Sequence, residues 1–114
     1  MKINGVELEI DFTDADLLEK IEKGSKEVFD KAEELKNLDV TPAEGIRQEC
    51  KILKDFLDYV LGDGTSIKLF GDKDSLKELL NAYEDILNER DKQYSEFQER
   101  VSKYSPDRIA RWIY

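Results

Sequence analysis

The stretch TPAEGIRQECKILKDFLDYVLGDG, residues 41–64, decides the fold, because it carries every signal of one amphipathic helix. Thr41 offers a side-chain oxygen that can cap a helix N-terminus, and Pro42 suits the first helical position, where no backbone N–H is needed. Apolar residues then recur every three or four positions, which places them on one face. These residues are Ile46, Cys50, Leu53, Leu57 and Val60. The glycines of 62–64 can adopt the left-handed backbone that ends a helix.

Two further amphipathic stretches flank this helix. The first is expected from about Asp14 to Leu38, with Thr13 as its cap, and Gly24 interrupts its apolar stripe. Glycine inside a helix costs about 1 kcal/mol relative to alanine, so either the close approach of another helix or a slight bend should account for it. The last stretch begins at Ser75 and can continue to Tyr104, roughly 45 Å at about 1.5 Å per residue. The sequence therefore predicts a mainly α fold, a three-helix antiparallel bundle with a long third helix.

Residues 1–12 predict a short β-hairpin ahead of the helices. Asn4-Gly5 is the preferred pair for a two-residue turn in which both residues have positive φ. After the turn, apolar and acidic residues alternate as far as Phe12, which gives one buried and one solvated face. Such a ribbon is marginal alone, so it either packs on its own helices or pairs with another chain. Residues 65–74 are expected to connect the second and third helices and to plug the end of the bundle.

The composition indicates one acidic domain. The chain has 114 residues, 27 of them acidic and 18 basic, and a formal net charge of −9 at pH 7. An acidic surface disfavours unspecific binding to nucleic acids and anionic membranes, and no stretch holds the roughly 20 apolar residues that span a bilayer. We expect a single domain over 1–114, with a hairpin (1–12), a helical bundle (13–104) and a C-terminal interaction segment (105–114), and no nucleic-acid or membrane partner.

Residue chemistry does not indicate an enzyme. The chain has no histidine, and its one cysteine, Cys50, falls on an apolar stripe, where it should behave as a small hydrophobe. The glycines near 62–71 lack the Gly-Lys-Ser/Thr of a phosphate loop. Acidic residues on the helices have lysines one turn away, which is typical of a solvated face. We therefore predict no catalytic, cofactor-binding or metal-binding residues.

A partner-binding surface is expected at the end of the long helix and in the segment that follows it. From about residue 90 the apolar stripe becomes aromatic, and Ser105-Pro106 predicts the end of that helix and the start of a short C-terminal helix with arginines beside its apolar side. Tryptophan and arginine are enriched at binding hot spots. The predicted surface comprises Tyr94, Phe97, Tyr104, Arg108, Ile109, Arg111 and Trp112. The alternatives are that the helix end folds back against the hairpin and that Trp112 docks on its own subunit.

Four segments of the sequence, taken together, resemble a known set of proteins. They are MKINGVELEIDF (1–12) followed by Asp14-Ala15-Asp16, IRQEC (46–50) leading to KDFLD (54–58), LGDGT (61–65) leading to LFG (69–71), and KYSPDR (103–108). In this set the chain resembles small proteins encoded in the tail modules of Gram-positive siphophages and their prophages, the tail assembly chaperones. None of the four features is a catalytic signature, and the family has no established ligand residues to carry across.

The resemblance implies a non-enzymatic chaperone in the cytoplasm of a bacterial host. Its implied partner is the long tape-measure protein or the tail-tube protein, which it would bind during tail morphogenesis. A structural or regulatory homo-oligomer of phage origin is the main alternative. A mimic of DNA is a further alternative, weakened because 18 basic residues are mixed among 27 acidic ones.

Overall fold

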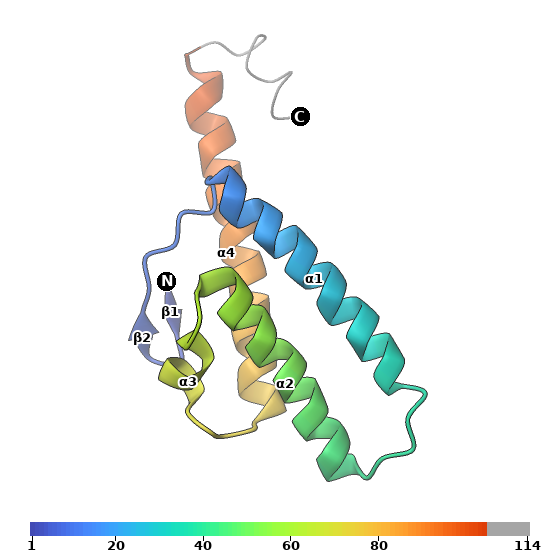
Figure 1. Ribbon diagram of the computed structural model, residues 1–114. Helices are drawn as coiled ribbons and strands as arrows, with labels where there is room; N and C mark the ends of the chain where they lie inside the picture. Colours follow the sequence, from blue (N-terminus) through green and yellow to red (C-terminus); the bar gives the residue numbers. More distant parts are fainter. Residues whose placement is uncertain (105–114) are drawn as a thin grey trace.

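The computed structural model describes residues 1–104 of the chain (Figure 1). Its elements, in chain order, are β1 (Lys2–Ile3), β2 (Val6–Glu7), α1 (Ala15–Leu35), α2 (Pro42–Leu61), α3 (Thr65–Phe70) and α4 (Leu76–Ser102). The predicted mainly α bundle, with a longest last helix and an N-terminal hairpin, is confirmed. The short C-terminal helix predicted within residues 105–114 lies outside the described residues.

Helix α2 is the central element, because it packs against both α1 and α4. Its buried face holds Cys50, Leu53, Phe56, Leu57 and Val60. The start and end follow the sequence signals. The side-chain oxygen of Thr41 accepts the Glu44 N–H at 3.3 Å, and Gly62 closes the helix with a φ of 113° while its N–H donates to the Asp58 carbonyl.

Gly24 lets α1 approach α2 closely, which is the first of the two explanations that the sequence left open. A Cβ atom on Gly24 would lie 2.9 Å from Cδ2 of Phe56, closer than side chains pack. The same Phe56 ring meets Tyr83 of α4 edge-on, with 4.9 Å between the ring centroids. One buried ring of the central helix therefore contacts both flanking helices.

The ends of α1 differ from the predicted boundaries. Its N-cap is Asp14, whose carboxylate accepts the N–H groups of Asp16 at 2.9 Å and Leu17 at 3.2 Å. Thr13, the predicted cap, instead donates its N–H and its hydroxyl to Asp11. The helix ends at Leu35, since the next three N–H groups each donate to a carbonyl three residues back, a tighter turn than the α-helix.

The expected connector contains a short helix, α3. Asp58 of α2 supports its start, because its two carboxylate oxygens accept the N–H of Ser66 at 2.8 Å and the hydroxyl of Ser66 at 3.0 Å. Leu69 and Phe70 are buried in the core, as expected for a plug, whereas Ile67 faces solvent.

The hairpin packs on the helices of its own chain. Asn4 and Gly5 have the positive φ angles that the predicted turn requires, 49° and 81°. Ile3 is buried in the core, and the Asn4 side-chain amide donates to the Leu69 carbonyl of α3 at 2.6 Å. The β-ladder is shorter than predicted and stops at Glu7, although the alternation of exposed and more buried residues continues to Phe12.

The extended segment after the hairpin is fixed to α4 by one side chain, Gln93. Its amide oxygen accepts the Phe12 N–H at 2.8 Å, and its amide nitrogen donates to the Ile10 carbonyl at 2.9 Å and to Glu89 at 3.3 Å. The Phe12 side chain is fully buried. The Gln93 amide thus pairs with the backbone as a neighbouring strand would.

Replacing Gly24 by alanine should destabilise the fold, although alanine favours helices. The new methyl group must displace the buried Phe56 ring, and overpacking of this kind costs about 1–3 kcal/mol. Gly45, also in a helix, is the matched control, because its Cβ would meet only Val40 at an ordinary 3.7 Å. We expect Gly45→Ala to raise the free energy of unfolding in urea and Gly24→Ala to lower it. Equal stabilisation by both would contradict the close approach.

Replacing Gln93 by leucine should loosen the N-terminal segment. The change preserves bulk but removes both backbone hydrogen bonds, which are partly buried; a fully buried group left unpaired costs about 1–3 kcal/mol, so we expect a loss toward the lower end of that range. Gln98→Leu, on the same helix, is the control, with an expected change within about 0.5 kcal/mol. Urea unfolding of the two variants separates these outcomes. Similar losses in both would show that Gln93 is not the anchor.

Candidate protein-binding groove at the end of α4

Helix α4 continues past the other helices. The radius of gyration is 16.7 Å, against roughly 13 Å for a compact domain of about 100 residues. Figure 1 shows the cause: the last turns of α4 extend beyond the N-terminal end of α1. Within residues 1–104, the turn that leads into α1 lies against this part of α4.

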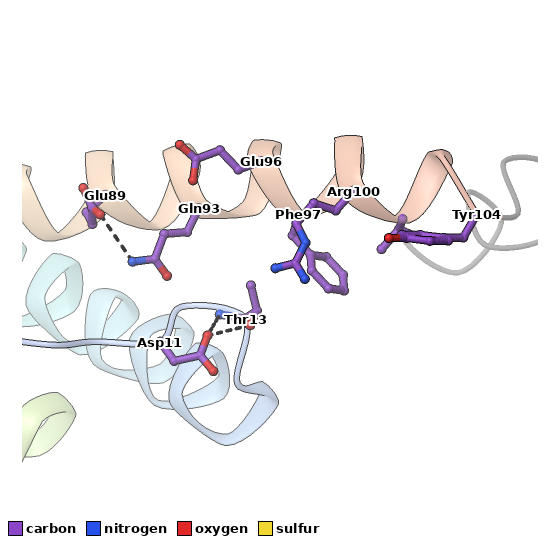
Figure 2. Close-up of a pocket in the computed structure, with 9 residues that line it drawn as sticks. Asp11, Thr13, Glu89, Gln93, Glu96, Phe97, Arg100 and Tyr104 are labelled. Atoms are coloured by element: carbon purple, nitrogen blue, oxygen red, sulfur yellow. Dashed lines mark hydrogen bonds between the residues drawn. The ribbon is translucent and has the colours of Figure 1, made fainter.

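An open groove of about 590 Å³ lies between that turn and α4, and we call it the α4-end groove. Its lining residues are Asp11 and Thr13 from the turn, and Glu89, Gln93, Glu96, Phe97, Arg100, Val101 and Tyr104 from the helix side. Figure 2 shows the α4 side chains following one another along the helix, with the Asp11–Thr13 turn beneath them. The same Gln93 that anchors the N-terminal segment thus sets the distance between the two walls.

The groove combines aromatic surface with acidic groups. Phe97 is 37% exposed and Tyr104 is 84% exposed, so both rings are open to a partner. The Thr13 hydroxyl and N–H both donate to Asp11 and lower the pKa of its carboxyl, which keeps that wall negatively charged. Glu89 and Glu96 add acid along the helix, and Arg100 is the basic lining residue.

The structure brings some of the predicted surface residues together and separates one. Phe97 and Tyr104 line the α4-end groove. Tyr94 lies in a different depression, between α1 and α4, beside Leu18 and Arg90. The other predicted residues, Arg108, Ile109, Arg111 and Trp112, lie outside the described residues.

Sequence reasoning missed the second wall of the groove. Gln93, Phe97 and Val101 recur every four residues, so their common side of the helix could have been read from the spacing. The approach of Asp11 and Thr13 to this helix involves the long-range pairing of Gln93 with the backbone beside them. No local sequence signal indicates that pairing.

The cysteine thiol and the possible metal ligands are not gathered into one site within residues 1–104. The chain has no histidine, and Cys50 is buried in the core, where burial raises the pKa of its thiol and so opposes formation of the reactive thiolate. Within residues 1–104, no group of three or more potential ligands is placed to hold a metal ion. In the same range, no helix has both the length and the apolar content needed to cross a bilayer.

Comparison with known proteins identifies the family but no activity. No curated protein and no solved structure matches the chain. A model of a family of unknown function, DUF6673, matches residues 4–113, which include β2, every described helix and the residues that line the α4-end groove. The chain therefore belongs to the DUF6673 family.

Proposed function

We propose that this chain is a non-enzymatic, tail assembly chaperone-like protein that binds a helical partner, such as a tape-measure protein, in the cytoplasm of a bacterial host. The observation that carries the proposal is the α4-end groove, in which the exposed rings of Phe97 and Tyr104 stand beside acidic side chains. The resemblance of the sequence to phage tail proteins supplies the class of partner.

A groove of this shape suits a helix as its ligand. An amphipathic helix binds a groove through apolar residues at three- and four-residue spacing. Phe97 and Val101 of α4, and Tyr104 just after it, offer apolar contacts at that same spacing. Because these contacts are few and open to solvent, the grip would be reversible, as a chaperone that must release its partner requires.

The acidic charge of the chain would affect both its association with a partner and its solubility. The formal net charge of −9 keeps the chain soluble beside an apolar partner. Acidic residues on the wall of a groove attract basic residues of the partner and fix their orientation, an effect that appears mainly in association rate and specificity. Asp11, whose ionised form is favoured by the hydrogen bonds from Thr13 that lower its pKa, is placed for this role.

Co-purification with the product of the long helical reading frame nearest the gene tests the proposal. We expect the tagged chain to retain that protein and the double variant Phe97→Ala/Tyr104→Ala to lose most of it, since truncating hot-spot aromatics costs about 2 kcal/mol or more each. The melting temperature should change little, because Tyr104 is exposed and Phe97 is partly exposed.

Phe29→Ala is the matched control, because Phe29 is an aromatic residue of α1 that is 64% exposed and does not line the α4-end groove. Equal loss of binding in the control would show that the α4-end groove is not the specific binding site. A sharp homo-oligomer that ignores the partner would instead favour a structural or regulatory assembly protein.

A further inference from the structure

A second groove lies on the bundle itself, between α1, α2 and α4, and has a volume of about 210 Å³. We propose that this groove binds an amphipathic helix of a partner protein, which inserts apolar side chains between α1 and α4 and places a lysine or arginine against Glu49. The residues that carry the proposal are Val28, Ala32, Glu49, Ile52, Leu76 and Leu80. The proposal is independent of the α4-end groove, since the two share no lining residue.

The walls of this groove are two apolar ridges at helical spacing. Val28 and Ala32 are four residues apart on α1, and Leu76 and Leu80 are four residues apart on α4. Both helices pack on α2, and Figure 1 shows them spreading apart toward the N-terminal end of α2. Residues spaced in this way interdigitate with the side-chain ridges of another helix.

The size and exposure of the groove indicate a protein ligand. Sites for small molecules usually measure about 300–1,000 Å³, so 210 Å³ suits a few aliphatic side chains better. Leu80, on its wall, remains 40% exposed, and a partner that covers it would remove that apolar surface from water.

Glu49 determines the charge of the proposed partner. It is half-buried in the groove, and no hydrogen bond or ion pair holds it within residues 1–104. The nearby lysines of α2 have acidic partners already: Lys51 lies 3.8 Å from Asp55, and Lys54 lies 2.9 Å from Asp74. A carboxylate among apolar groups gains most from a cationic partner. The net charge of −9 disfavours a second copy of this acidic chain as that partner.

A charge-swap experiment on the full-length chain tests the proposal. The probes are two fluorescent helical peptides of about 18 residues, or roughly five turns. Each has leucines at three- and four-residue spacing, and they differ only in a lysine or a glutamate beside the leucine stripe. By fluorescence anisotropy, we expect the lysine peptide to bind the wild-type chain more tightly. Glu49→Lys should reverse that order, with a change of roughly tenfold for each peptide.

Two matched controls and a second variant complete the design. Asp63→Lys makes the same change in net charge at an exposed loop residue and should leave the order of affinities unchanged. Leu80→Asp should weaken the binding of both peptides. Ile67 of α3 is also exposed, and Ile67→Asp should leave the binding unchanged. Circular dichroism melting checks that each variant is folded. If Leu80→Asp unfolds the chain, the comparison of the two peptides on the wild-type chain and on Glu49→Lys still tests the proposal.

Three results would overturn the proposal. One is an unchanged order of affinities in Glu49→Lys. Another is loss of peptide binding in Tyr104→Ala, which would place the peptides in the α4-end groove. The third is a dimer, detected by sedimentation, that dissociates in the Leu80→Asp variant but stays intact when the peptides are added. That result would assign the groove to a second copy of the chain.

Discussion

The two hydrogen bonds between the Gln93 side chain and the backbone of Ile10 and Phe12 fix the N-terminal segment on α4. They join residues that are more than 80 positions apart in the chain. With the segment in place, Phe12 is buried in the core, and the Asp11–Thr13 turn becomes one wall of the α4-end groove.

The remainder of the fold provides a frame for this attachment. Phe56 of α2 lies against Gly24 of α1 and against Tyr83 of α4, so the three long helices share one contact point in the core. Away from that point α1 and α4 diverge, and the second groove lies between them. Both candidate binding surfaces therefore arise where the other elements within residues 1–104 leave α4 partly uncovered, one beyond the bundle and one on its open side.

The sequence predicted those parts of the fold that depend on local signals. The limits of α2 followed from Thr41, Pro42 and Gly62, because capping residues act within one turn. The predicted N-cap of α1 was wrong by one residue, since Thr13 and Asp14 are both good caps and neighbours in the chain; Asp14 caps the helix, and Thr13 bonds to Asp11. The α3 helix was missed as well, because its support comes from Asp58, on another helix.

The same distinction applies to the candidate site. Phe97 and Tyr104 were predicted as surface residues from their place on a long aromatic stripe, which is a local feature of the sequence, and both are exposed. Asp11 and Thr13 were not, because their place in the groove depends on long-range hydrogen bonds that leave no periodic signal. For Glu49, only the packing of three helices shows that this carboxylate lies among apolar side chains.

Amide hydrogen exchange at Phe12, followed residue by residue by NMR on the full chain, tests the central claim most directly. If Gln93 holds the segment on α4, the Phe12 amide should exchange slowly, at a rate close to that of buried α2 amides such as Leu57. Exchange at the rate of an unfolded chain would contradict the account, because the turn would then not be held against α4 and the α4-end groove would lack its second wall.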